Sequence, residues 1–158
     1  MSGLVECEQE GSAQSWIYLH ESEVDIVYND FEGYISKILG YEFIPHEKFV
    51  RGVTYWAILD GEVVGRIGIR LELTEDLKKF GGHIGYIVRP SFRRKGIASK
   101  MLNLALQTDY AKDIGKILLT CDLDNEASEK TIVKNGGIFY DVVELENRSN
   151  KKRFWINL

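Results

Sequence analysis

The sequence predicts a single domain of the α/β (α+β) class. We expect a mixed, mostly antiparallel sheet with a central parallel strand–helix–strand pair and helices on both faces. Two observations carry this prediction: an Asp-Gly turn joins two apolar runs near residue 60, and a strand–helix–strand pattern follows after residue 83. The 158 residues can bury a substantial core, and no repeat or Pro/Gly/Ser-rich linker divides them. Residues 1–158 are therefore expected to form one unit.

The region before residue 50 is expected to be helical after a polar start. The first twenty residues are polar and should be held loosely, at least in part. Ser22–Asp25 resembles a capping box, whose side chains satisfy the first free amides of a helix. Apolar residues then recur at helical spacing from Val24 to Leu39. Gly40 can end this helix, and Gly33 can break or bend it.

Strands and helices alternate over the rest of the chain. Asp60-Gly61 is a strong hairpin signal between two apolar runs. The crossover from His83 to Cys121 should join parallel strands in the right-handed sense. We expect the last two strands of the chain to pair with each other. The expected strands are 53–59, 62–71, 83–88, 116–121, 137–145 and 151–157, and the expected helices are 74–80, 95–110 and 125–134.

Composition argues against several classes of protein. The formal net charge of −4 does not fit a general nucleic-acid binder, which normally has a basic surface over the whole domain. No apolar run approaches the roughly 20 residues of a membrane helix. The N-terminus lacks the basic flank and apolar segment of a secretory signal. Cys7 and Cys121 show neither a disulfide framework nor metal-ligand spacing, so we expect a cytoplasmic protein without a metal.

A basic turn at residues 88–100, VRPSFRRKGIASK, stands out in this acidic chain. It begins a helix with positive charge, although the helix dipole favours acidic residues there. The helix at 125–134 begins in the favoured way, with Asp124, Asn125 and Glu126. One reading is that the basic residues are solvated surface charges. The contrast between the two helix starts favours the other reading, a small anionic ligand.

The turn has the parts of a phosphate site. A strand that leads through a glycine-containing turn into a helix exposes several backbone N–H groups in one direction. Gly96 lets an oxygen approach the backbone, and Ala98 and Ser99 keep the next positions small. Arg93 to Lys95 add positive charge. The nucleotide-binding patterns G-x-x-x-x-G-K-S/T and G-x-G-x-x-G are absent.

The six residues 93–98, RRKGIA, fit the pattern R/Q-x-x-G-x-G/A, with Val88 and Pro90 before them. Asn125, Ser128, Lys134 and Gly136 fit a second pattern, N-x-x-A-x-x-x-Y-x-K-x-G. Together these motifs resemble the GNAT superfamily of N-acetyltransferases. The resemblance covers the last two thirds of the chain closely and the N-terminal part in outline. GGHIGYIVRPSFRRKG looks in particular like a bacterial branch of predicted acetyltransferases.

The resemblance implies acetyl-CoA (coenzyme A) as co-substrate and acetyl transfer to an amine by direct attack in a ternary complex. It also implies that the strands 83–88 and 116–121 separate near Val88. Backbone groups of Ile87 and Val88 would contact the pantetheine arm, and Asn125 and Ser128 would approach it from the next helix. Asn125 is equally readable as a helix cap. The residues implied for the pyrophosphate are Arg93, Arg94, Lys95, Gly96, Ile97, Ala98 and Ser99.

The reaction needs a base, because a lysine-like amine has a pKa near 10.4 and must attack in its neutral form. His83 is the first candidate by chemical type, with a structural histidine as the alternative. Glu72 on the preceding strand is the second, with an exposed carboxylate as its alternative. Cys121 as an acetylated nucleophile is less favoured than a buried, small apolar residue.

The chain departs from the family pattern at Ile132, where many members have a tyrosine that protonates the leaving thiolate. Water or a hydroxyl such as that of Tyr86 or Tyr140 would have to do so here. The departure also leaves open a second function class, an acyl-CoA binding domain that senses and does not catalyse.

The acceptor is expected to be a small-molecule or protein amine, without nucleic-acid or membrane partners. Whether the protein is a monomer or a homodimer stays open. Six acidic and aromatic side chains have two readings. Together they form an entrance for a cationic amine, or the acids belong to the surface and the aromatics to the core. These are Glu72, Glu75, Asp76, Tyr55, Trp56 and Tyr86.

Overall fold

The structure is a computed structural model that describes residues 6–7, 9–10, 25–43, 50–144, 146 and 148–158. Residues 22–24 of the predicted capping box lie outside this part, as do most of the first twenty. The strands are β1 (Gly52–Leu59), β2 (Glu62–Arg70), β3 (Ile84–Val88), β4 (Lys116–Asp122), β5 (Ile138–Val143) and β6 (Lys151–Asn157). The helices are α3 (Asp25–Asn29), α4 (Phe31–Gly40), α5 (Glu75–Phe80), η2 (Pro90–Phe92), α6 (Ile97–Leu106), α7 (Asp109–Ile114) and α8 (Glu126–Lys134).

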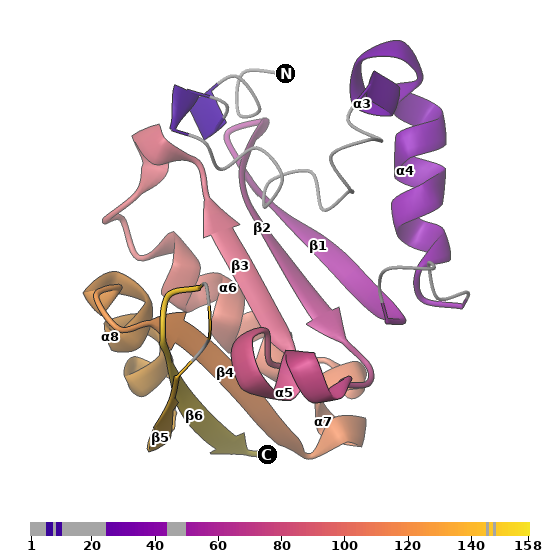
Figure 1. Cartoon of the computed structure of the whole chain (residues 1–158). Coiled ribbons are helices and arrows are strands. Elements are labelled where there is room, and N and C mark those ends of the chain that lie inside the picture. Colours follow the sequence, from indigo (N-terminus) through magenta and orange to yellow (C-terminus); the bar gives the residue numbers. More distant parts are fainter. Residues whose placement is uncertain (1–5, 8, 11–24, 44–49, 145, 147) are drawn as a thin grey trace.

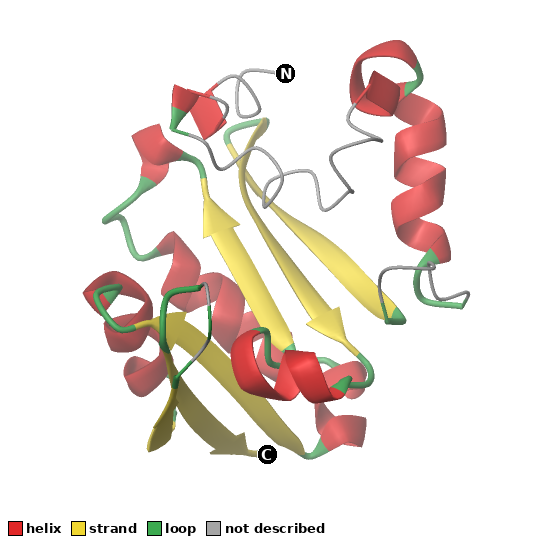
Figure 2. Ribbon diagram, viewed as in Figure 1, coloured by secondary structure: helices red, strands yellow, loops and turns green. Residues whose placement is uncertain are grey.

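Two antiparallel three-stranded sheets form the centre of the molecule (Figures 1 and 2). The first has the order β1-β2-β3 and the second the order β4-β6-β5. Asp60 and Gly61 have positive φ values of 50° and 81°, as a two-residue turn of type I′ requires, so the predicted hairpin is confirmed. The predicted pairing of the last two strands is confirmed as well, in the form of β5 against β6.

The expected continuous sheet with a parallel pair at its centre is not confirmed, because β3 and β4 lie in different sheets. They meet near the start of β3, where N of His83, the residue directly before β3, donates to O of Leu118 in β4 at 2.7 Å. Leu118 N then donates to the His83 side chain (Nδ1, 2.9 Å) and not to a carbonyl of β3. The His83 side chain therefore accepts the hydrogen bond that the Leu118 N–H group would give to a carbonyl of β3 in a parallel ladder. From this point the strands run in the same general direction and diverge (Figure 1).

The helices cover both faces of the first sheet. On one face α6 buries Met101, Leu102 and Ala105 against Ile67 and Ile84, in a core that continues into the second sheet. On the opposite face α3 and α4 bury a second apolar cluster, which includes Val27, Tyr34, Ile38 and Tyr41 and has Trp56 and Ile87 at its border. Figure 1 shows α4 and α6 on opposite sides of the strands. The prediction of helices on both faces is confirmed.

Two predicted helices are each divided in the structure by a capping residue. The break in the first lies at Asp30, whose Oδ1 accepts from Gly33 N at 2.9 Å and so begins α4. Gly33 is thus the residue capped and not the break. The predicted helix 95–110 ends at Leu106, because the Thr108 hydroxyl accepts from Ala111 N at 3.3 Å and begins α7. Short polar side chains favour such starts because they bond free amides.

Candidate functional site

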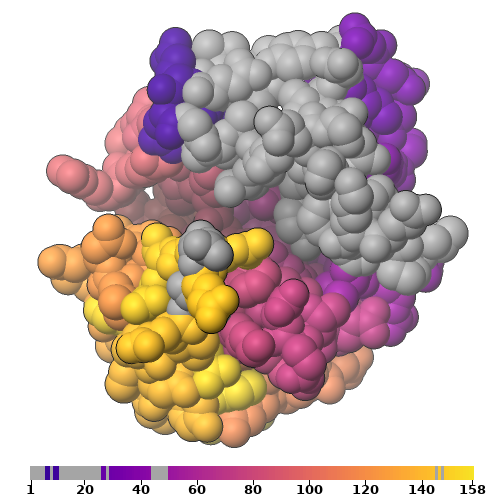
Figure 3. All heavy atoms as spheres, viewed as in Figure 1, coloured from indigo at the N-terminus to yellow at the C-terminus, as the bar shows by residue number. Residues whose placement is uncertain are grey.

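The divergence of β3 and β4 creates a V-shaped site, which we call the wedge. Its closed end consists of Gly82 and His83 against Leu118. Its open end lies between Val88, with the turn that follows it, and the start of α8. Figure 3 shows the surface hollowed there, between the salmon turn after β3 and the orange segment around α8. The site predicted from the basic turn therefore lies at the open end of the wedge.

The turn before α6 has an unusual backbone. Arg94 and Gly96 both have positive φ values, 60° and 78°. Gly96 is the N-cap of α6 and provides no side-chain hydrogen bond to the first amides. The starts of α4, α5, α7 and α8 all have such a bond, from Asp30, Thr74, Thr108 and Asn125. The start of α6 thus offers backbone N–H groups and positive charge to an anion, as the sequence predicted.

Acidic side chains from the N-terminal segment contact this turn. The Arg93 guanidinium binds the Glu10 carboxylate through both terminal nitrogens, with Nη1 to Oε2 at 2.8 Å, while its Nε donates to Val88 O at 3.0 Å. The Glu6 carboxylate accepts from Arg89 Nε at 2.5 Å and from Ser91 N at 3.1 Å. These contacts span more than 80 residues of sequence, and no local pattern predicted them.

Of the basic residues in the turn, Arg89 has a structural role. Its guanidinium is buried between Glu6 and Glu62, with Nη1 to Glu62 Oε2 at 2.7 Å. Arg94 and Lys95 are exposed, and Lys95 Nζ lies 4.8 Å from the centre of the Phe92 ring. The positive charge available to a ligand at this turn therefore comes from Arg93, Arg94 and Lys95.

The opposite wall of the open end is the start of α8. Asn125 is a helix cap, because its Oδ1 accepts from Ser128 N at 3.0 Å. Ser128 Oγ lies 2.8 Å from the Tyr86 hydroxyl of β3, so a hydrogen bond crosses the wedge. Ile132, the position that is tyrosine in the family pattern, is fully buried in the core.

His83 is half-buried at the closed end. Burial and the nearby Arg70 guanidinium lower the pKa of His83 to about 4. Because a backbone amide can only donate, Nδ1 carries no proton and the neutral ring carries its proton on Nε2. The lone pair that a base would use is therefore engaged by Leu118. These contacts favour a structural role for His83, and its catalytic role stays a prediction.

Glu72 lies two residues beyond the end of β2. Its side chain is half exposed, and its carboxylate is 3.6 Å from Arg51 Nε. Arg70 N donates to His83 O, which places the end of β2 at the closed end. Glu72 follows two residues later, so it lies beyond the closed end and away from the basic turn. Its role as a base also stays a prediction.

The predicted aromatic entrance is divided between different faces. Trp56 packs against Tyr34 on the α4 side, with ring centres 6.5 Å apart, whereas Tyr86 packs into the α6 core. Glu75 forms an exposed ion pair with Lys78 at 2.7 Å. The aromatic side chains therefore do not form one cluster.

Cys121 belongs to the core. Burial raises the pKa of its thiol to about 11, which keeps the thiol protonated at neutral pH. This environment fits a small apolar residue and not a nucleophile.

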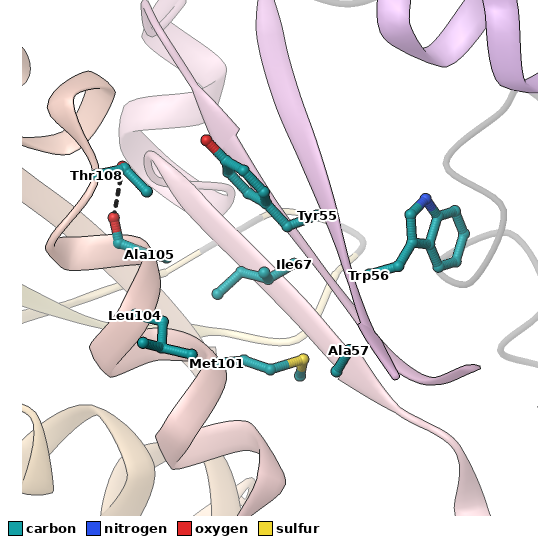
Figure 4. A pocket seen from close by; sticks show the side chains of 8 residues that line it. All are labelled: Tyr55, Trp56, Ala57, Ile67, Met101, Leu104, Ala105 and Thr108. Carbon is teal, nitrogen blue, oxygen red and sulfur yellow. Dashed lines mark hydrogen bonds between the residues drawn. The ribbon is translucent and has the colours of Figure 1, made fainter. Parts of the chain in front are cut away.

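An apolar pocket of about 240 Å³ lies elsewhere, between the β1–β2 hairpin and α6 (Figure 4). Tyr55, Ile67 and Met101 line it, while the Trp56 ring points away to the other face of the sheet (Figure 4). The pocket lacks the charged groups of the basic turn, so we place the functional site in the wedge.

Residues 15–136 match the model of the acetyltransferase (GNAT) family. The chain belongs to this family. The basic turn, β3 and α8 all lie within the matched region. A search among curated proteins gave no match.

Solved GNAT structures share the fold at low sequence identity. The microcin C7 self-immunity acetyltransferase MccE, in complex with acetyl-CoA and AMP, has a TM-score of 0.64 at 17% identity, over 98% of this chain and 84% of that chain. RimL, a ribosomal α-N-protein acetyltransferase in complex with coenzyme A, has a TM-score of 0.58 at 22% identity, over 80% and 72%. A spermidine N-acetyltransferase SpeG chimera from Vibrio cholerae and hSSAT has a TM-score of 0.56 at 15% identity, over 88% and 93%.

Within the part of the chain that the structure describes, no helix combines the length and apolar character needed to cross a membrane.

Proposed function

We propose that this GNAT acetyltransferase moves an acetyl group from acetyl-CoA to a primary amine, by direct attack in a ternary complex. The observation that carries the proposal is the start of α6, where Arg94 and Gly96 have positive φ values and no side chain caps the first amides. This backbone fits a pyrophosphate, because first-turn N–H groups without a side-chain cap lie beside three cationic residues, Arg93, Arg94 and Lys95.

The residues predicted for coenzyme A fit this placement. Arg93, Arg94, Lys95, Gly96, Ile97, Ala98 and Ser99 would hold the pyrophosphate. Ile87 and Val88 would present their backbone to the pantetheine arm along one wall of the wedge, and Asn125 and Ser128 would line the other. The fold neighbours MccE and RimL were solved with acetyl-CoA and coenzyme A, which supports the same co-substrate here.

The chemistry requires little of the protein beyond binding and proton transfer. The neutral amine attacks the thioester carbonyl, and the carbon–sulfur bond breaks. His83 or Glu72 would accept the amine proton, directly or through water. We place Glu72 before His83 in this role, because the lone pair of His83 is engaged by Leu118 and its pKa is low.

The acceptor is a small-molecule or protein amine. The fold neighbours include enzymes of both kinds, an α-N-protein acetyltransferase and a spermidine N-acetyltransferase. We propose a cytoplasmic location, because Cys7 and Cys121 are both buried and are not joined in a disulfide, as expected in a reducing compartment.

The test is a thermal shift followed by an acceptor screen. Acetyl-CoA at about 100 times its Kd should stabilise the protein by about 2.7 kcal/mol and raise its Tm. Release of free thiol would then be measured with polyamines, amino sugars and peptides with free N-termini. No shift with acetyl-CoA would refute the proposal. A shift without turnover of any amine would favour the alternative that the buried Ile132 leaves open, an acyl-CoA sensing domain.

A further inference from the structure

The phenol of Tyr86 lies inside the wedge. Side chains alternate along β3, so Tyr86 shares a face with Ile84 and Val88 and packs into the core beneath α6. Its hydroxyl reaches across to the first turn of α8, 2.8 Å from Ser128 Oγ and 3.4 Å from Ser128 O. The hydroxyl thus lies between the two walls that would enclose the pantetheine arm.

Acetyl transfer leaves one proton to be placed on sulfur. The amine loses a proton as its nitrogen bonds to the acetyl carbon, and the electron pair of the broken carbon–sulfur bond stays on the thiolate. A donor beside the sulfur lowers the barrier because the charge is neutralised as it forms. Such a donor must hold its proton at neutral pH and must lie in the wedge.

We propose that the Tyr86 hydroxyl gives this proton to the departing thiolate and is the general acid of the reaction. This inference rests on the proposed function. The phenolate that forms is reprotonated from solvent at the open end, so the proton released by the amine balances the one taken up by coenzyme A. Burial raises the pKa of the Tyr86 phenol above its ordinary value, so the donor is protonated throughout the physiological range.

Tyr140, Tyr110 and Cys121 are less suitable donors. The Tyr140 ring is 59% exposed on β5 and lies 6.4 Å from the Trp155 ring, outside the wedge. The Tyr110 hydroxyl, on α7, donates to the Glu42 carboxylate. Cys121 is enclosed in the core.

Tyr86→Phe removes the hydroxyl and keeps the ring. We expect kcat to fall about 10²-fold, at the low end for the loss of a general acid because a thiolate leaves readily. The Kd for acetyl-CoA should stay within about twofold, since the backbone and the basic turn are unchanged. Tyr140→Phe, the control outside the wedge, should keep wild-type kcat.

A structural role for the hydroxyl would give a different pattern. Ser128→Ala removes the bond to Ser128 Oγ but keeps the phenol, so it should lower kcat much less than Tyr86→Phe. Equal losses in the two variants would overturn the proposal. So would a Tyr86→Phe variant that keeps kcat within about threefold of wild type (under ~0.7 kcal/mol of barrier).

A measurement on the wild-type protein tests the proposal without depending on how the variants fold. Proton donation during thiolate departure should give a solvent deuterium isotope effect on kcat, and Tyr86→Phe should lose it. Absence of the effect in the wild type would count against Tyr86. This failure is distinct from failure of the proposed function, which would appear earlier as absence of a thermal shift with acetyl-CoA.

Discussion

The closed and open ends of the wedge use similar elements for different purposes. At the closed end the polar groups are hydrogen-bonded within the chain. His83 and Leu118 exchange two hydrogen bonds, and Arg70 Nη1 donates to Gly81 O and Gly82 O at 3.2 and 3.0 Å. At the open end the first amides of α6 receive no side-chain cap. The difference teaches that internal contacts close one end, while the other end leaves the first amides of α6 without a side-chain cap, where we propose that the ligand binds.

Gly96→Trp should have the largest effect on binding. A Cβ on Gly96 would meet no atom within 4 Å, so the indole would occupy the open space where the pyrophosphate is proposed to lie. We expect the Kd for acetyl-CoA to rise by roughly 100-fold or more, about 2.7 kcal/mol, and the thermal shift to disappear. Titration calorimetry and melting curves would measure both.

Gly115→Trp is the matched control for this variant. Gly115 also has a positive φ of 71°, and its nearest contact for a Cβ is 3.8 Å, but it lies between α7 and β4, away from the open end. Both variants should lose about 1–2 kcal/mol of unfolding free energy from backbone strain. Loss of acetyl-CoA binding in both would show that strain, and not the position of Gly96, is responsible.

Gly82→Ala should have the largest effect on stability. Gly82 has a φ of 63°, and an added Cβ would lie 2.5 Å from Leu118 O, so either β3 or β4 must move. We expect a loss of about 2–5 kcal/mol, from strain and overpacking together. Gly61→Ala, with a φ of 81° and no atom within 4 Å of the added Cβ, should lose only the strain. Urea unfolding would compare them, and equal losses would contradict the close contact at the closed end.

His83 should make stability depend on pH. Its pKa falls from 6.5 to about 4 on folding, so between these values the unfolded chain binds a proton that the folded chain does not. Stability should therefore be complete above pH 6.5 and should decrease as the pH falls toward 4. Unfolding in urea across this range would measure the slope.

His83→Asn is the informative variant at this position. The Asn amide oxygen can accept from Leu118 N in place of Nδ1, but it does not titrate. We expect the variant to lose the part of the pH dependence that His83 contributes. An unchanged profile would assign the dependence to other groups.

Glu10→Gln should have the smallest effect. Glu10 holds the Arg93 guanidinium that is proposed to meet the pyrophosphate, so its neutralisation should tighten acetyl-CoA binding by about two- to fivefold, within the range for exposed ion pairs. Glu75→Gln, in an exposed pair with Lys78, should leave the affinity unchanged. Weaker binding by the Glu10 variant would mean that the carboxylate orders the turn for its ligand.

The sequence predicted those features that short stretches of chain determine. The Asp60-Gly61 turn, the cap at Asn125 and the glycine turn that begins α6 each depend on a few neighbouring residues, and each is present. The positions of most strands followed from the same local patterns.

The features that were missed depend on side chains far apart in the sequence. The bond from Leu118 N to His83 joins residues 35 positions apart and replaces the expected parallel ladder. The contact between Arg93 and Glu10 spans 83 positions, and the bond between Tyr86 and Ser128 spans 42. No periodicity or turn signal encodes such pairs, since they form only when distant parts of the chain come together.

The bond from Leu118 N to the His83 side chain also has a consequence for hydrogen exchange. The amide of Leu118 is protected by a group of the first sheet, although Leu118 belongs to the second. Deuterium uptake by the Leu118 amide therefore requires only that the two sheets separate at His83. Uptake by the amides of β4 that bond to β6 requires the second sheet itself to open. A rate for Leu118 faster than for those amides would identify the two halves as separate cooperative units, and the ratio of the rates would give the free energy that holds them together.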